Sequence, residues 1–141
     1  MNPNILPSNR ATVVGAINPA SQGAGTVSTG WIDMSDYGSL LAIAQFGAFG
    51  SDASADVSVE QADTDAGGNA KAVAGKGAKG VDDDGSQVLV DVFEEDLDLN
   101  GGFRYVRVSI EVATAASLVA GVVLGFDARY QPGEHAASVV S

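Results

Sequence analysis

Alternation of apolar and polar side chains is strongest between residues 101 and 130. A period of two over this length is typical of β-strands, because successive side chains on a strand point to opposite faces. The first apolar row is Val106, Val108, Ile110 and Val112, and the outward row beside it is Tyr105, Arg107, Ser109 and Glu111. After a short turn, a second row shares one face and is expected to point toward the core: Leu118, Ala120, Val122, Leu124, Phe126, Ala128 and Tyr130. The segment predicts two long strands joined by a turn.

Shorter alternating or apolar segments predict the remaining strands. Residues 56–62 and 87–93 alternate cleanly, and residues 26–33 hold the only tryptophan, Trp31. Two weaker strands are expected at 12–16 and 71–75. The stretch 63–87, rich in glycine, lysine and aspartate, predicts loops around the second of these.

Residues 39–50 are nearly all apolar and admit two interpretations. Leu40, Leu41, Ala44 and Ala48 would share one face of a helix. The internal Gly47 and the two phenylalanines in this segment instead favour a strand buried on both faces. We favour the strand.

These segments predict an all-β protein of seven or eight strands, with turns every 10–15 residues. The spacing favours an antiparallel β-sandwich, jelly-roll-like in arrangement, because no convincing amphipathic helix separates the strands. We expect an extended N-terminal arm over residues 1–25, the sandwich over 26–132 and a C-terminal tail over 133–141. One domain of this size can bury a substantial core.

The amino-acid composition argues against several classes of function but does not by itself point to one. The 141 residues carry a formal net charge of −11, which disfavours binding to nucleic acid or to anionic membrane surfaces. No apolar run reaches the length of a membrane span. The chain contains no cysteine, so disulfides and cysteine-based metal sites are excluded.

Candidate catalytic and metal-binding patterns are all incomplete. His135 is the only histidine and has no neighbouring base or further ligands in its small-residue tail. The acidic stretches 63–67 and 82–85 lack the glutamate that completes a calcium loop. The acidic run 94–98 is expected to be solvated, and the stretch 74–80 fails the phosphate-loop pattern after Gly80. We therefore expect no enzyme activity, no cofactor and no metal.

Several strings between residues 25 and 132 resemble small virion proteins of tailed bacteriophages. They are Thr29–Ser35, Ser39–Ile43, Val59–Ala62, Asp96–Asp98, Gly102–Val108 and Leu124–Tyr130. The resemblance implies a β-sandwich on or near the head shell, as in the decoration (cement) proteins of that group. It supplies no catalytic residues, and the stretch 66–86 departs from it.

The resemblance implies a capsid decoration protein that is assembled in the host cytoplasm and bridges subunits of the major capsid protein on the virion surface. It also implies a homo-oligomer, with a trimer favoured, which would hide apolar pairs such as Leu41/Ile43 or Val119/Val123. The candidate contact residues are Asn4, Ile5, Leu6, Arg10, Trp31, Tyr105, Arg107 and Arg129. Two alternatives remain open: a connector or tail component, and a carbohydrate-binding module using Trp31 or Tyr37 with Asp33 and Asp36.

Overall fold

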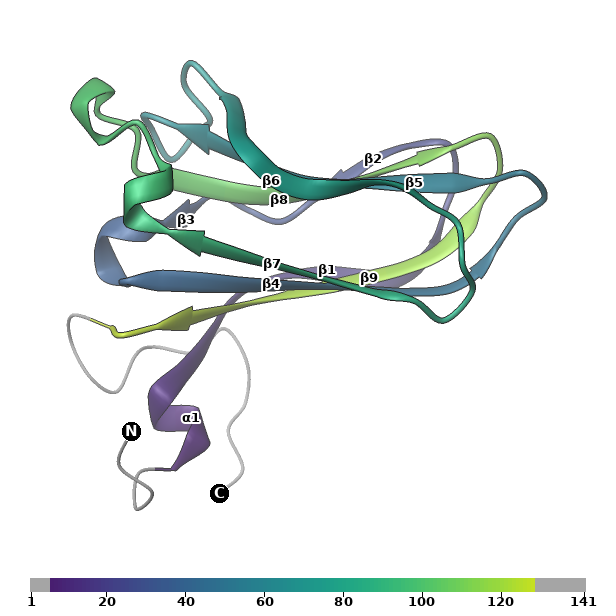
Figure 1. Cartoon of the computed structure of the whole chain (residues 1–141), viewed down its shortest axis with the longest axis horizontal. Coiled ribbons are helices and arrows are strands. Elements are labelled where there is room, and N and C mark those ends of the chain that lie inside the picture. Colours follow the sequence, from purple (N-terminus) through teal and green to yellow (C-terminus); the bar gives the residue numbers. More distant parts are fainter. Residues whose placement is uncertain (1–5, 129–141) are drawn as a thin grey trace.

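The computed structural model describes residues 6–128, which form a β-sandwich of two antiparallel sheets (Figure 1). The strands are β1 (Ala11–Gln22), β2 (Gly25–Ser28), β3 (Ile32–Asp33), β4 (Ser39–Phe49), β5 (Ser54–Ala62), β6 (Lys71–Val81), β7 (Gln87–Phe93), β8 (Tyr105–Ala113) and β9 (Ser117–Phe126). The helical segments are α1 (Pro7–Arg10) and the 3-10 turns η1 (Met34–Asp36), η2 (Glu94–Asp96) and η3 (Leu99–Gly101). None of the helices within the described range is long and apolar enough to cross a membrane.

The strand order confirms the predicted jelly-roll arrangement. One sheet has the order β1-β9-β4-β7 and the other β2-β8-β5-β6, with the short β3 paired to β8. Among the eight strands of these two paths, every step along the chain except β5 to β6 passes from one sheet to the other. Such a path places the first and last strands in the same sheet, where β1 and β9 lie side by side (Figure 1). This is the double-sheet architecture of jelly rolls.

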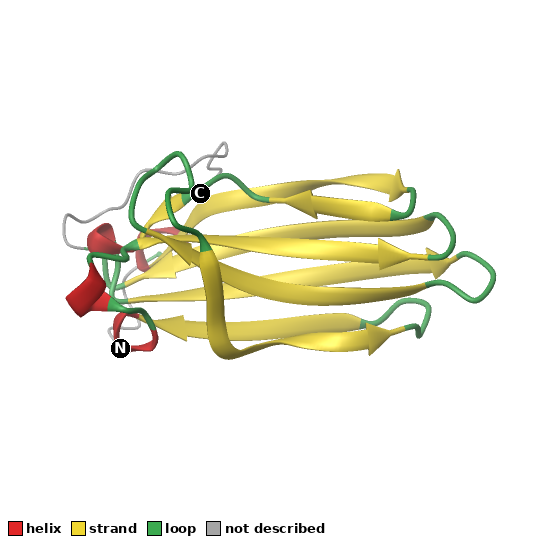
Figure 2. Cartoon of the chain, turned by 90° about the horizontal axis from the view of Figure 1, so that it is seen from above, coloured by secondary structure: helices red, strands yellow, loops and turns green. Residues whose placement is uncertain are grey.

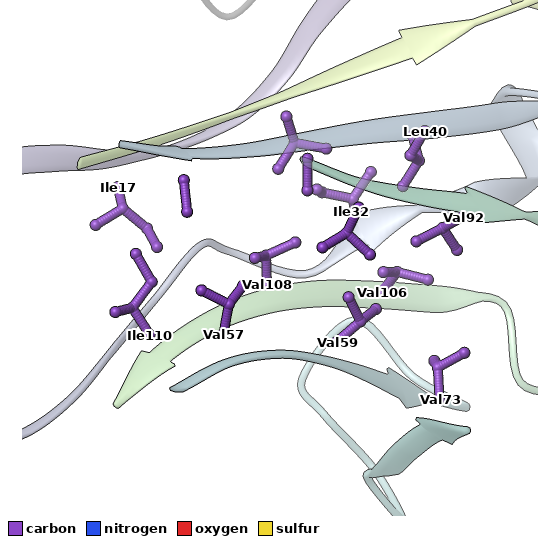
Figure 3. Packing of buried hydrophobic residues seen from close by; sticks show 14 of the residues in the cluster. Ile17, Ile32, Leu40, Val57, Val59, Val73, Val92, Val106, Val108 and Ile110 are labelled. Atoms are coloured by element: carbon purple, nitrogen blue, oxygen red, sulfur yellow. The ribbon is translucent and has the colours of Figure 1, made fainter. Parts of the chain in front are cut away.

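The hydrophobic core lies between the two sheets (Figure 3). Phe46 is fully buried in it, and its ring stacks on that of Phe49 with the centroids 5.4 Å apart. Aliphatic side chains from both sheets fill the remaining space, among them Ile17, Leu40, Val59, Val92, Val106 and Ile110. Most of these residues are β-branched, which suits packing on a pleated surface.

The strand interpretation of residues 39–50 is confirmed, since β4 pairs with β7 on one side and β9 on the other. Burial alternates along it: Leu40, Ala42 and Ala44 are buried, whereas Leu41 and Ile43 are half-buried on the opposite face. The segment is mostly apolar because it lies in the interior of the sheet, where both of its faces are removed in part from water.

The expected orientation of β9 is wrong. The buried residues of this strand are Ser117, Val119, Val123 and Gly125, whereas Leu118 is exposed and Val122 is half-buried on the outer face. Both rows of the strand are apolar, so alternation in sequence could not decide which row faces the core. For the same reason, the pair Val119/Val123 belongs to the core and is not a surface patch.

Seen from above, the long strands run along the length of the sandwich (Figure 2). Two edge strands, β1 and β6, are longer than predicted, and both contain irregularities. In β1 the register with β9 shifts between Val13 and Gly15 and again between Ile17 and Ala20. In β6 the register with β5 also shifts twice. Irregularities break the alternation of side chains, which explains why the pattern predicted only short strands here. They also make the sheet edges poor templates for further strand pairing.

Candidate interaction surfaces

The outer side of the four-stranded sheet carries a continuous apolar surface, which we call the apolar face. Strand register places its side chains in rows across the sheet. The central rows are Val13–Leu124–Leu41–Asp91 and Ala16–Val122–Ile43–Leu89, and a further row is Ala11–Phe126–Ser39–Phe93. Leu118 extends the face along β9. Among the paired strand residues described on this face, Asp91 is the one charged side chain.

Large apolar side chains project from this face into solvent. Leu89 is 59% exposed, Leu118 49% and Phe93 48%. Single exposed apolar residues are common on proteins, but contiguous apolar patches mark surfaces that bind another molecule. The face therefore has the chemical character of an interface.

A shallow groove runs along the apolar face beside Pro19. It has a volume of about 390 Å³ and is lined by Pro19, Ala20, Gln45, Phe46, Gly47, Leu118, Val119 and Ala120. A neighbouring hollow of about 220 Å³ continues it toward Ala16, Ile43 and Val122. Both lie at the second register shift of β1, where the strand departs from regular pairing with β9.

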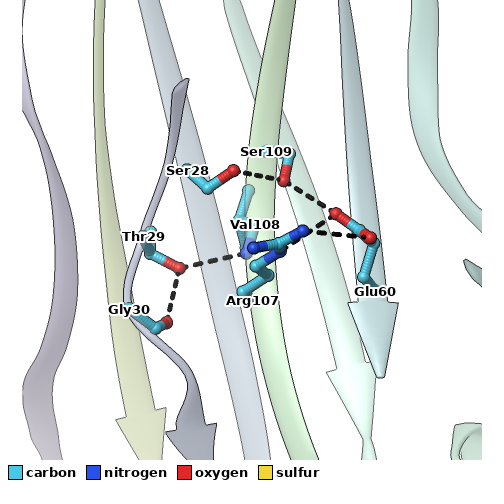
Figure 4. Close-up of polar contacts among 7 residues, drawn as sticks. All are labelled: Ser28, Thr29, Gly30, Glu60, Arg107, Val108 and Ser109. Carbon is cyan, nitrogen blue, oxygen red and sulfur yellow. Dashed lines mark hydrogen bonds and ion pairs between the residues drawn. The ribbon is translucent and has the colours of Figure 1, made fainter. Parts of the chain in front are cut away.

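The outer side of the five-stranded sheet is polar and is organised around Arg107 (Figure 4). The Arg107 guanidinium donates hydrogen bonds to Glu60 from Nε, at 3.1 Å, and from Nη2, at 3.4 Å. The Ser109 hydroxyl also donates to Glu60, at 3.0 Å, and lies 2.7 Å from the hydroxyl of Ser28. The network joins β2, β8 and β5 across the sheet.

The pKa of Glu60 reflects these contacts. Partial burial raises the pKa of this carboxyl. The hydrogen bonds from Arg107 and Ser109 and the positive charge of Arg107 together lower the pKa by more than burial raises it. The net effect holds the pKa of Glu60 below its ordinary value. The carboxylate is thus stabilised in its charged form, which suits a structural ion pair rather than a proton-transfer group.

The third candidate surface is the end of the sandwich that carries the 3-10 turns and α1 (Figure 1). Arg104 pairs with Asp33 at 3.1 Å and donates a hydrogen bond to the Tyr105 hydroxyl at 2.9 Å. Hydrogen bonding with Tyr105 and the charge of Asp33 raise the pKa of Arg104. A small hollow of about 120 Å³ beside Arg104 is lined also by Met34 and Leu99, together with Ser35 and Glu94.

Asp98 ties this end to the edge strand β6. Lys71 of β6 contacts its carboxylate at 2.7 Å and lies 4.2 Å from the centroid of the Phe103 ring. The hydrogen bond from Lys71 and a second one from the backbone of Gly101 lower the pKa of Asp98. The backbone N–H of Asp98 donates to the buried amide oxygen of Gln61 at 2.8 Å.

The strings that carry the phage resemblance converge on this end. Ile32 and Asp33 pair with Val106 and Tyr105 through β3 and β8, and Arg104 accepts a backbone hydrogen bond from Met34. The other described strings meet here through the contacts Gln61–Asp98 and Ser39–Phe126. Segments distant in sequence therefore build one structural unit.

The predicted contact residues do not form a single surface. Trp31, Tyr105 and Arg107 lie on or beside the outer side of the five-stranded sheet, and the Arg107 guanidinium carbon is 4.6 Å from the Trp31 ring centroid. Leu6, exposed, and Arg10 lie at the two ends of α1. Asn4, Ile5 and Arg129 are outside the described residues, as is His135.

The residues considered for carbohydrate binding are not brought together as one open site. Tyr37 packs against the core. Its ring lies against Gly125, in the space that a side chain at position 125 would fill. Trp31 instead has Arg107 over its ring and Gly67 against its indole nitrogen. Asp33 is engaged with Ser35 and Arg104.

Within residues 6–128 no three histidine, aspartate or glutamate side chains are placed to hold a metal ion. The acidic loop at Asp63 is held by its own hydrogen bonds, including one from Asn69 to Asp63 at 2.7 Å. The chain matches no protein-family model, no curated protein and no solved structure. The jelly-roll sandwich is therefore the class that the structure defines, and the phage resemblance stays a prediction.

Proposed function

We propose that this protein is a non-enzymatic structural component of a tailed-phage virion, and specifically a decoration protein that stabilises the head shell. In this role many copies bind across junctions between subunits of the major capsid protein. Each copy contributes a modest contact, and the many contacts together stabilise the shell through multivalency.

The apolar face is the observation that carries this proposal. A protein with a net charge of −11 concentrates its charges on the other sheet and on the loops, and leaves one broad sheet face almost uncharged. Such a surface is costly in water for an isolated molecule. It is expected in a protein whose working state is an assembly.

Two further observations support a structural role. The charged groups described at the sandwich end and on the five-stranded sheet form ion pairs, such as Arg104–Asp33 and Arg107–Glu60, that link strands and turns. In addition, the jelly roll is an architecture that viral capsid proteins use, although lectins and cupins use it as well. The fold alone therefore supports the proposal only by analogy, and the stronger support comes from the surfaces of the molecule.

The test is the copy number of the protein in purified virions, measured by quantitative mass spectrometry against the major capsid protein. A decoration protein should be present in on the order of hundreds of copies, because it follows the repeats of the shell. A ring-like number of roughly six to twelve would assign it to the connector or tail instead. Absence from virions would overturn the proposal.

A companion measurement tests what the protein does on the shell. Heads assembled without it should lose their DNA or break at a lower temperature than decorated heads. Adding the purified protein back should restore the higher temperature. Equal stability of the two kinds of head would contradict a cementing role even if the copy number were high.

A further inference from the structure

We propose that the apolar face is a self-association surface, on which a second copy of this chain packs its own apolar face in a two-fold, sheet-on-sheet dimer. This inference concerns the free protein and does not depend on the virion assignment. It rests on the charge distribution, the size and the shape of the face.

The charge distribution allows a second copy to cover this face, because the centre of the face carries no charged side chain. Two copies that each carry −11 repel one another, so an acidic surface could not pair with itself. The central strands β9 and β4 present Leu124, Leu41, Val122 and Ile43 to the contact, and Asp91 lies on the edge strand β7. At that edge the Asp91 carboxylate remains hydrated when the face is covered.

The size of the face reaches what a specific dimer needs. Four strands that each occupy a width of about 4.8 Å cover about 19 Å, and the eight residues from Ser39 to Phe46, at about 3.3 Å each, cover about 26 Å. The footprint is therefore about 500 Å² per copy, or about 1,000 Å² for two copies, at the lower bound for a specific interface.

The shape of the face is self-complementary. Leu89 projects from β7 at one edge, and the hollow near Ala16 and Pro19 lies at the opposite edge, beside β1. Leu89 and Ala16 belong to one register row, Ala16–Val122–Ile43–Leu89. A two-fold axis parallel to the strands exchanges the two edges, so it places Leu89 of each copy over the hollow of the other.

The same operation pairs the centres of the two faces. It brings β4 of one copy over β9 of the other, so the Ile43 and Val122 side chains of the two copies meet. Aliphatic side chains from facing sheets interdigitate at a separation of about 10 Å, as in the interior of a sandwich. The contact would thus repeat outside the molecule the packing found between its own two sheets.

The first test is sedimentation equilibrium of the purified full chain from about 1 to 300 µM. We expect a mass that rises to twice the 14.2-kDa chain mass. Ile43→Lys should weaken this association by more than about 100-fold, because it places a charge at the centre of an apolar contact. Ser58→Lys, at an exposed position on the five-stranded sheet, is the matched control and should leave association unchanged.

A wild-type protein that remains monomeric throughout this range would overturn the proposal. A trimer or larger species that is unaffected by Ile43→Lys would do so as well. If Ile43→Lys fails to fold, as judged by circular dichroism, cross-linking decides the question without it.

The cross-linking test uses the absence of cysteine from the chain. Ala16→Cys and Leu89→Cys copies are mixed and treated with a short bismaleimide, whose reach suits facing sheets about 10 Å apart. The mixture should yield a cross-linked heterodimer in high proportion. A mixture of Ala16→Cys with Glu111→Cys, which lies on the opposite sheet, should not. Equal yields from the two mixtures would contradict the proposed two-fold packing.

Discussion

Arg107 lies over the indole ring of Trp31, with its guanidinium carbon 4.6 Å from the ring centroid, while its Nε donates to Glu60 at 3.1 Å. One guanidinium therefore joins the segment before β3 to strands β8 and β5. A planar guanidinium suits this double role, because it stacks on an aromatic face while its edge donates hydrogen bonds. The arrangement makes Trp31 part of the outer surface of the scaffold rather than an open platform for a ligand.

Replacing Glu60 with glutamine should reveal the contribution of this ion pair as a pH-dependent loss of stability. The folded-state pKa of Glu60 lies below its ordinary value of 4.5, so its stabilising effect is fully present above that value. It is lost as the pH falls through the folded-state pKa. We expect Glu60→Gln to lower the free energy of unfolding by about 1 kcal/mol at pH 7, and by progressively less below pH 4.5.

Urea unfolding at a series of pH values measures this difference. Glu111→Gln is a suitable control, because Glu111 is an exposed residue on the outer side of the same sheet, in the neighbouring strand β8. The control should change stability little and without a comparable trend. A Glu60→Gln deficit that stayed constant from pH 7 to about pH 3 would show that the lost contact is not ionic.

Gly67 provides a second prediction, because its backbone and its surroundings both exclude a side chain. Its φ is +84°, and a Cβ atom there would lie 2.7 Å from the Trp31 indole nitrogen. Gly67→Ala should destabilise the protein by more than about 1 kcal/mol and displace the indole ring. Trp31 is the only tryptophan, so its fluorescence reports the displacement directly.

Gly102 separates strain of the backbone from the clash with the ring. Its φ of +81° is nearly the same, but no atom lies within 4 Å of the position a Cβ would take. Gly102→Ala should therefore destabilise the protein less than Gly67→Ala and leave the emission maximum unchanged. Similar destabilisation by the two substitutions, with no spectral shift in Gly67→Ala, would show that the indole is not confined there.

The alternation of residues was enough to predict the class of fold, because it appears in several segments separated by turns. In β8, where one face is buried and the other is polar, it also gave the correct orientation: Val106, Val108 and Ile110 are in the core. In β9 both faces are apolar, so the pattern had no polar row to mark the outside. The strand was therefore oriented with Val122 and Leu124 inward, although its core residues include Val119 and Val123.

Of the apolar face, the sequence predicted only the pair Leu41/Ile43, and its extent across the sheet was missed for the same reason. Its side chains come from four strands spread over residues 11–126, and only strand register brings them into rows. The one sequence signal was an excess of apolar residues in β4 and β9 over what a single buried face requires. By contrast, pairs such as Arg107–Glu60 depend on contacts across strands that no local pattern specifies.

Gln61 supports the last prediction, which concerns how the end with the 3-10 turns is held to the sheet. Its side chain is only 5% exposed; it accepts a hydrogen bond from the backbone N–H of Asp98 at 2.8 Å and donates one to the carbonyl of Ala72 at 3.3 Å. Gln61→Ala leaves both backbone groups without this partner. We expect the free energy of unfolding to fall by about 1–3 kcal/mol, because buried polar groups are costly when unpaired.

The matched control is Gln22→Ala, which removes a glutamine whose side-chain hydrogen bond, to Gly23, is exposed. Water can replace that bond, so the control should change stability by less than about 0.5 kcal/mol. Hydrogen exchange gives a second readout, since the Asp98 amide should lose protection in Gln61→Ala before the sheet does. Unchanged protection of Asp98 would mean that the turns are held by other contacts, such as the buried Leu97 side chain.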